Sequence, residues 1–157
     1  MTTPNLQLVQ NQPLQPPSKP GEWTLAQIQA ALSRPLPSNY LKTKIQGGQR
    51  IPFLPWYRVN EILDKYAPGW MWEIVNVMTS EDRFFLTGRL TIPTAEGLVY
   101  REATGTEELK LVNSKTGEIE ELAYGDPSSN AESKAFRRAA ARFGLALYLY
   151  VKPVNFH

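Results

Sequence analysis

The sequence has 157 residues, 42% hydrophobic and 20% charged, enough for the core of one globular domain and unlike a wholly disordered chain. It has no cysteine, which excludes disulfide bonds, cysteine-based zinc sites and thiol nucleophiles. No run of about 18 apolar residues is present to span a membrane. The first residues do not resemble a secretory signal, so we expect a cytoplasmic protein.

The net charge is only +2, but the basic residues gather in two blocks. Residues 23–60 contain five basic residues and no acid, and residues 131–144 contain four basic residues and one acid. Residues 102–126, between the blocks, contain seven acids. Each block alone is typical of a solvated surface. Two such blocks in one small domain favour a site for a polyanion.

The first predicted elements are a tail, a helix and a hairpin. Residues 1–22 are rich in Pro and Gln and are predicted to be a disordered tail. A helix is predicted to begin after Thr24, because Thr24 and Gln27 have the spacing of a capping box. The segments 40–45 and 50–54 flank Gly47-Gly48 and are predicted to pair as a small hairpin.

A second helix is predicted from about Pro55, a residue suited to the first helical turn, to the Pro68-Gly69 pair. Three strand-like runs follow, at residues 70–78, 84–92 and 98–107. The short turns between them predict an antiparallel meander.

Residues 108–128 are predicted to form an inserted hairpin and loop. A helix is then predicted from about Ser129 to Leu147. The expected fold class is α+β: an antiparallel β-meander packed by a long C-terminal helix, with an N-terminal helix and small hairpin.

The last predicted helix carries most of the second basic block. At 100° per residue, its basic side chains form one arc opposite the apolar stripe: Lys134, Arg137, Arg138 and Arg142. Like charges on one helix face repel, so they add nothing to the stability of the helix. A bound phosphate backbone would remove that repulsion and release counterions. The pattern leaves open a plain surface helix or a nucleic-acid site.

Tyr57 and Arg58 are further candidates, because they begin the second predicted helix. Tyr57 lies opposite the apolar stripe of that helix, and Arg58 lies at the edge of the stripe. These side chains could flank a groove, or Arg58 could extend its stem along the apolar surface.

The sequence gives little support for catalysis. It has no phosphate-binding loop motif, and the one histidine is His157, the last residue printed. Glu102, Glu107 and Glu108 could hold Mg²⁺ in a nuclease, but solvated carboxylates at a strand end explain them as well. We therefore expect no enzyme activity, no cofactor and no metal.

Several segments together resemble the DNA-binding domain of the Rad52 single-strand annealing family, in a compact, prokaryotic-type form. The resemblance spans residues 24–150 apart from the insertion. It rests on these segments: residues 25–32, Tyr40, Gly47-Gly48-Gln49, Tyr57-Arg58-Val59, Gly69-Trp70, residues 100–105 and residues 135–144.

The resemblance implies a β-β-β-α core, a homo-oligomeric ring and ATP-independent annealing of complementary single strands in recombinational DNA repair. It implies an annealing domain over residues 23–152, followed by a tail over 153–157. The family's deep DNA site falls on Arg58, Arg137 and Arg138. A further basic family position falls on Ala141, beside Arg142, and an outer-site lysine falls near Lys110.

Single-stranded DNA and other copies of the chain are the expected partners, with no membrane. A single-strand-binding protein and a recombinase are candidate partner proteins. Loading of a recombinase is not expected, because the long C-terminal region of eukaryotic members has no counterpart here. A prokaryotic member would be associated with the nucleoid. Two alternatives stay open: a protector of single-stranded ends that does not anneal, and a metal-dependent nuclease.

Overall fold

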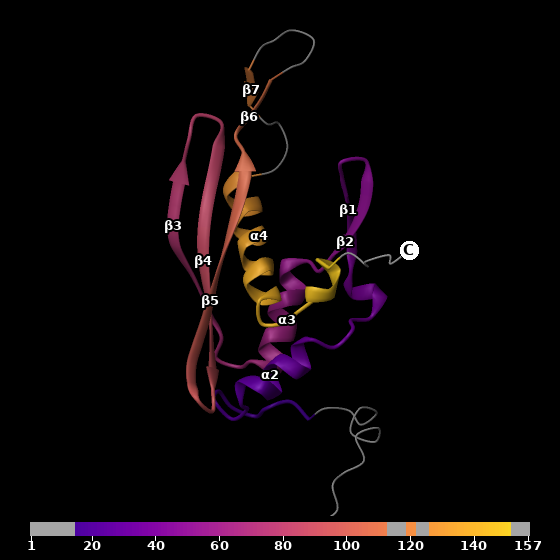
Figure 1. The fold of residues 1–157 in the computed structure, drawn as a ribbon, viewed down its shortest axis with the longest axis vertical. Coiled ribbons are helices and arrows are strands. Elements are labelled where there is room, and N and C mark those ends of the chain that lie inside the picture. The colour runs from indigo at the N-terminus through magenta and orange to yellow at the C-terminus, as the bar shows by residue number, and fades with distance from the viewer. Residues whose placement is uncertain (1–14, 113–118, 122–125, 152–157) are drawn as a thin grey trace, which may run out of the picture.

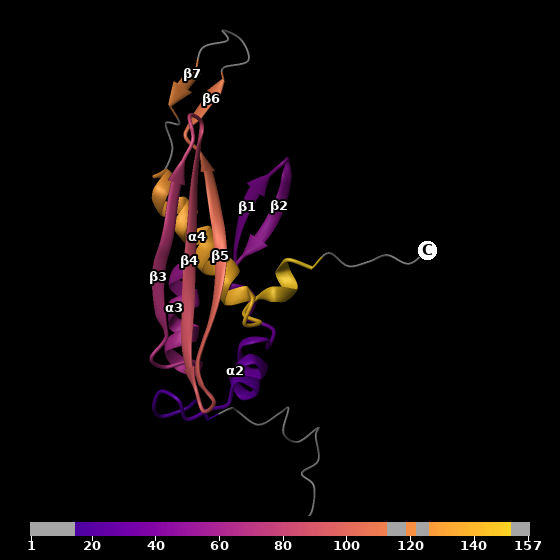
Figure 2. The ribbon, with the colours of Figure 1, turned by 60° about the vertical axis from the view of Figure 1, so that its left-hand side comes forward.

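A computed structural model describes residues 15–112, 119–121 and 126–151, with backbone only at 110–112 and 119–121. A three-stranded antiparallel sheet in the order β3-β4-β5 carries the helices on one face (Figures 1 and 2). The predicted α+β class is confirmed. The elements in chain order are α2 (Leu25–Leu32), β1 (Lys42–Gln46), β2 (Gln49–Phe53), α3 (Trp56–Tyr66), β3 (Met71–Thr79), β4 (Arg83–Thr94), β5 (Gly97–Glu108), β6 (Lys110–Val112), β7 (Ile119–Glu121) and α4 (Pro127–Ala141).

Local sequence signals account for the first elements. Thr24 caps α2 with the predicted capping box, in which the Gln27 backbone N–H donates to the Thr24 hydroxyl and the Gln27 side chain accepts from the Thr24 N–H. The β1–β2 hairpin is also confirmed. Gly47 and Gly48 both have positive φ, 59° and 76°, as a two-residue hairpin turn of the favoured twist requires. Pro55 is the residue before α3 rather than its first residue.

The meander is confirmed, and two glycines let the layers approach closely. A Cβ on Gly105 of β5 would lie 1.9 Å from the carbonyl oxygen of Ala131 in α4. A Cβ on Gly88 of β4 would lie 2.0 Å from the ring of Trp72. The absence of a side chain at Gly105 lets α4 approach β5, and its absence at Gly88 lets the ring of Trp72, on the adjacent strand β3, lie over β4. The buried core between the sheet and the helices includes Leu63, Leu90 and Phe143.

The last helix is shorter than predicted. It ends at Ala141 instead of Leu147, because Gly144 and Ala146 adopt left-handed conformations with φ of 109° and 55°. The turn brings residues after α4 back onto the N-terminal part of the chain. The backbone N–H of Leu36 donates to the Tyr148 hydroxyl at 3.2 Å, and Gly144 lies against Ser33.

The outer edge of β3 is open. Within the described strands β3 pairs only with β4, and a bulge interrupts that pairing between Ile74 and Asn76. Its side chains include several exposed apolar ones: Met71, Ile74, Val75, Val77 and Met78. An open apolar edge of this kind can bind another chain.

The insertion forms the short strands β6 and β7, as predicted, while its turn (113–118) and the loop at 122–125 lie outside the described residues. Residues 15–22 of the predicted tail form turns, and residues 1–14 and 152–157 lie outside the description. The domain boundaries therefore stay predictions. No helix in the described part of the chain combines the length and the apolar character needed to cross a bilayer.

Candidate nucleic-acid interface

The basic side chains of α4 point in two directions. Arg137 points toward the β1–β2 hairpin, where its guanidinium carbon lies 4.9 Å from the centre of the Phe53 ring. Lys134 and Arg138 point toward β5. The predicted arc of cations therefore covers the hairpin side and the β5 side of one helix.

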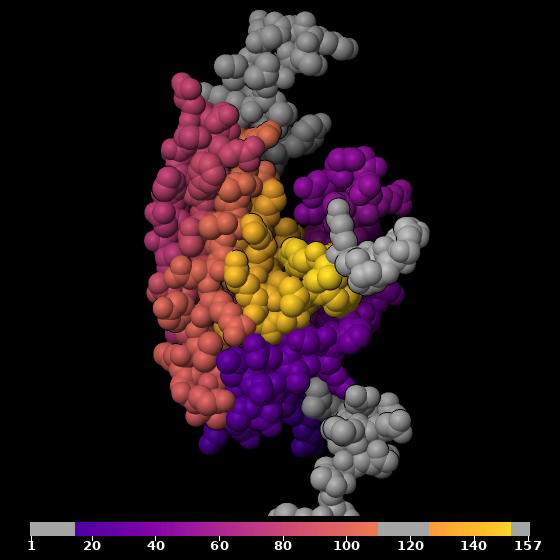
Figure 3. Space-filling model, in the orientation of Figure 1, coloured from indigo at the N-terminus to yellow at the C-terminus, as the bar shows by residue number. Residues whose placement is uncertain are grey.

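A groove lies between the hairpin, Arg137 of α4 and the residues 145–150 that follow the helix, and most of its lining is apolar. Its lining includes Lys44 of β1, Phe53 of β2, Arg137 of α4 and Tyr150. The Lys44 ammonium lies 5.7 Å from the centre of the same Phe53 ring that Arg137 covers. In Figure 3 the surface is hollowed between the purple hairpin and the orange helix. Two cations from distant parts of the chain thus share one aromatic ring at the wall of a groove.

The electrostatics of the groove disfavour its own positive charges. Burial lowers the pKa of Arg137. Burial also lowers the pKa of Lys44, and the charges of Arg137 and Lys134 lower it further, while Glu107 raises it. The pKa of Tyr150 is raised by burial, and the nearby charges of Arg137 and Arg138 oppose that shift. Four cations, Lys44, Lys134, Arg137 and Arg138, therefore lie close enough to influence this groove.

Lys134 and Arg138 also cover the outer edge of β5. Arg138 Nη1 donates to the carbonyl oxygen of Thr104 at 3.0 Å, and Lys134 Nζ donates to that of Thr106 at 3.3 Å. Lys134 also pairs with Glu107 at 2.5 Å. These contacts satisfy strand carbonyls that have no partner strand, and the exposed Arg138 pairs with a backbone oxygen rather than with an acid.

Arg58 and Tyr57 form a separate group at the start of α3. Arg58 lies over the Tyr40 ring, with its guanidinium carbon 4.4 Å from the ring centre, and pairs with Glu61 at 3.0 Å. Lys42 Nζ lies 5.3 Å from the centre of the Tyr57 ring. Among the described residues, no contact joins Arg58 to the cations of α4. Its predicted part in a shared site stays a prediction.

The remaining predicted positions lie apart from the groove. Arg142 is exposed and lines a shallow depression with Arg101 and Glu102. Ala141, at a position that is basic in the resembled family, is buried. Lys110 belongs to β6, but its side chain lies outside the described residues.

The three carboxylates considered for a nuclease have different cationic partners. Glu102 pairs with Arg89 at 2.8 Å, Glu108 with Arg83 at 3.2 Å, and Glu107 with Lys134. Among the described residues, no group of three or more His, Cys, Asp or Glu side chains could hold a metal ion. The part of the chain that the structure describes gives the nuclease alternative no support.

Lys44 is the groove residue that sequence reasoning missed. A usable signal was present, because Lys42 and Lys44 alternate with Thr43 along β1 and therefore share one face of the hairpin. The sequence did not reveal that this hairpin folds against α4, which is 90 residues further along the chain.

The family profile described as Rad52/22 family double-strand break repair protein matches residues 24–157. "DNA repair RAD52-like protein 1, mitochondrial" of Arabidopsis thaliana is 36% identical over 128 residues, covering 80% of this chain and 67% of that protein. "DNA repair RAD52-like protein 2, chloroplastic" of the same plant is 39% identical over 130 residues, covering 80% and 60%. The names of these two relatives place them in organelles, so the cytoplasmic location expected for this chain stays a prediction.

Proposed function

Because this chain belongs to the Rad52/22 family of double-strand break repair proteins, we propose that it binds single-stranded DNA in the groove between the β1–β2 hairpin and α4. It then anneals complementary strands during recombinational DNA repair, without ATP. The observation that carries the proposal is the convergence of Lys44 and Arg137 on the Phe53 ring, where burial lowers the pKa of both cations.

A DNA backbone is the polyanion that best suits this groove. Each bound phosphate offsets the repulsion among the cations and releases counterions. A guanidinium such as that of Arg137 can bind two phosphate oxygens at once and can also stack on a base. Arg138 lies one residue further along α4 and points about 100° away, so the two side chains can reach neighbouring phosphates.

The assembled form we propose is a closed homo-oligomeric ring. The open apolar edge of β3 supports self-association, since such an edge is unfavourable in a lone protomer. A ring would place the grooves of successive protomers along one continuous path for a strand. A single-strand-binding protein or a recombinase could then meet the protein on DNA.

The proposed activity requires no catalytic residue, cofactor or metal. Annealing therefore proceeds in EDTA without nucleotide. A fluorescence assay with two complementary labelled oligonucleotides measures it directly. If the protein binds single strands but does not accelerate their pairing, it is a protector of single-stranded ends instead. Cleavage of the oligonucleotides that depends on Mg²⁺ would support the nuclease alternative.

The extension of the DNA site from the groove onto the β5 side of α4 is tested with Arg138→Ala, using Lys65→Ala as the matched control. Lys65 is an exposed cation of α3 that does not line the groove. Arg138→Ala should leave oligomer size unchanged and the free energy of unfolding within about 0.5 kcal/mol of the parent. It should lower the log–log salt slope of single-strand binding by about 0.7, the value for one phosphate contact. An intact assembly with the parental affinity and slope would overturn the assignment.

A further inference from the structure

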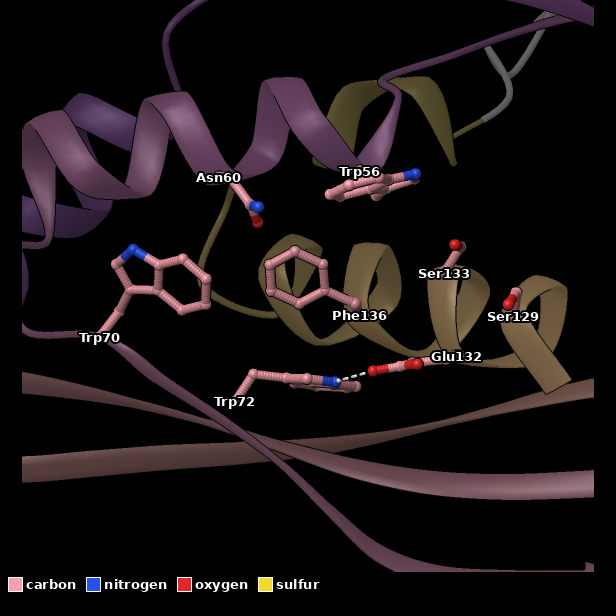
Figure 4. Close-up of a pocket in the computed structure, with 8 residues that line it drawn as sticks. All are labelled: Trp56, Asn60, Trp70, Trp72, Ser129, Glu132, Ser133 and Phe136. Atoms are coloured by element: carbon pink, nitrogen blue, oxygen red, sulfur yellow. Dashed lines mark hydrogen bonds between the residues drawn. The ribbon is translucent and has the colours of Figure 1, made fainter.

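A second cavity lies on the other side of α4, between that helix, α3 and the start of β3. It has a volume of about 460 Å³. Figure 4 shows four aromatic rings around it: Trp56, Trp70, Trp72 and Phe136. Glu132, Asn60 and two serines of α4 supply the polar groups of its wall. Trp56 is 50% exposed, which leaves the cavity open to solvent.

Three of the rings, Trp70, Trp72 and Phe136, form a connected aromatic wall. The Phe136 ring stacks on Trp70 at 5.6 Å between centres and meets Trp72 at 5.0 Å. The indole N–H of Trp72 donates to Glu132 at 3.1 Å, and that of Trp70 donates to Asp64 at 2.7 Å. Hydrogen bonds to carboxylates polarise the donor, so both indoles present electron-rich faces.

The chemistry of the wall selects for positive charge. Aromatic faces carry negative electrostatic potential and attract ammonium and guanidinium groups. Glu132 accepts a hydrogen bond from the Trp72 indole at one carboxylate oxygen, and an ionised carboxylate can accept several hydrogen bonds. No lysine or arginine is among the described residues that line the cavity. A phosphate group would meet a carboxylate here, so the cavity is unfavourable for the DNA backbone.

We propose that this aromatic cavity binds the side chain of a lysine or arginine carried on a segment of a partner protein. The aliphatic stem would lie along Trp56 and Phe136, and the charged end would lie over the indole faces beside Glu132. Charge and shape complementarity favour such a side chain, independently of the proposed DNA function. On α4 the cavity residue Glu132 and the groove residue Arg137 are about 140° apart, so both sites can be occupied together.

The test is a titration of the full-length protein followed by tryptophan fluorescence and calorimetry. The probe is a blocked pentapeptide with one lysine between glycines, compared with the same peptide carrying an arginine or the uncharged isostere norleucine. Lysine and arginine peptides should bind saturably, and the norleucine peptide at least about tenfold more weakly, because it lacks the cation. Equal binding of the norleucine peptide would overturn the proposal and leave a merely apolar pocket.

Two variants locate the binding. Glu132→Gln keeps an acceptor for the Trp72 N–H but removes the charge, and should weaken the lysine peptide about tenfold. Trp56→Ala removes the exposed wall of the cavity and should weaken the binding of both cationic peptides. This variant still tests the proposal if Glu132→Gln does not fold. Arg138→Ala, on the β5 side of α4, should leave peptide binding unchanged. Stronger binding of dAMP than of the lysine peptide would identify a nucleobase site instead, and the absence of saturable binding by either cationic peptide would also overturn the proposal.

Discussion

The two sides of α4 differ in the charge of the side chains that line them. On the hairpin side, Lys44 and Arg137 line a groove, and burial together with the charges of Arg137 and Lys134 lowers the pKa of Lys44. On the α3 side, four aromatic rings and a carboxylate surround a cavity. Both surfaces belong to one helix of 15 residues. The elements that pack beside each side of α4, more than the helix itself, therefore determine what that side can bind.

Both sides depend on the same close packing of α4 against β5. Buried alanines of α4, among them Ala131 and Ala135, lie against the sheet. The backbone of α4 packs directly on Gly105 of β5. A change at this contact affects the groove and the cavity together, whereas a change at the surface affects only one of them.

The largest expected effect is therefore that of Gly105→Ala. The added methyl would overlap the Ala131 carbonyl, whose oxygen is 1.9 Å from the position of a Cβ. We expect a loss of about 3 kcal/mol in the free energy of unfolding, measured by urea denaturation. Thr104→Ala, on the exposed neighbouring residue, is the control and should change stability by less than about 0.5 kcal/mol. Parental stability of Gly105→Ala would show that α4 lies further from β5 than described.

The next largest effect is a difference in single-strand binding between variants of two arginines, one in α4 and one just after it. Arg137 lines the groove, while Arg142 lies in the exposed depression with Glu102. Arg137→Ala should weaken single-strand binding by about thirtyfold, on the order of 2 kcal/mol for a lost charge-assisted contact. Arg142→Ala should weaken it by less than about threefold. Fluorescence anisotropy with one oligonucleotide compares them, and equal losses would indicate that net charge, not the groove, governs binding.

A smaller effect concerns pH. The lowered pKa of Lys44 means that this ammonium loses its proton below the ordinary value of 10.5. The affinity for single-stranded DNA should therefore fall as the pH rises from the lowered pKa of Lys44 toward 10.5. The free energy of unfolding should change in the opposite sense, because the charged form is disfavoured in the folded state and this penalty disappears as Lys44 deprotonates. Lys44→Arg, which stays charged, should flatten both profiles, and unchanged profiles in this variant would contradict the assignment.

The smallest effect is expected from Arg58→Ala. Arg58 is partly exposed and its contacts are with Glu61 and Tyr40, so its removal should lower the melting temperature only slightly. Its effect on the log of single-strand affinity should be less than half that of Arg137→Ala. A loss as large as that of Arg137→Ala would show that the start of α3 and the groove form one site, as the family resemblance implies.

The sequence predicted best those features that depend on a few neighbouring residues. The capping box at Thr24 and Gln27 and the Gly47-Gly48 hairpin are confirmed because their geometry is local. The predicted end of α4 was wrong. The apolar periodicity continues through Phe143 and Leu147, but the backbone conformations of Gly144 and Ala146 end the helix earlier. The periodicity of apolar residues does not reveal that the chain turns at Gly144 and Ala146.

Features that depend on packing between distant segments could not be predicted. The basic residues of α4 were found from their spacing, but their division between the hairpin and β5 follows from tertiary contacts. Trp70 and Trp72 pack against the core, and the cavity that they line depends on how α3 packs against α4. Sequence patterns report which side of an element is polar or apolar, and they do not report how completely a neighbour covers it.

The return of the chain after α4 onto its N-terminal part sets an order of events during synthesis. The hydroxyl of Tyr148 that accepts from Leu36 N–H is 112 residues further along the chain, whereas the strands of the meander are joined by short turns. Pairing of β3, β4 and β5 can therefore begin while the ribosome is still adding residues, but α2 cannot complete its contacts until residues 143–148 have emerged. The apolar face of α2 stays incompletely covered until residues 143–148 are made, so a nascent chain needs protection from other chains between the synthesis of α2 and that of residues 143–148.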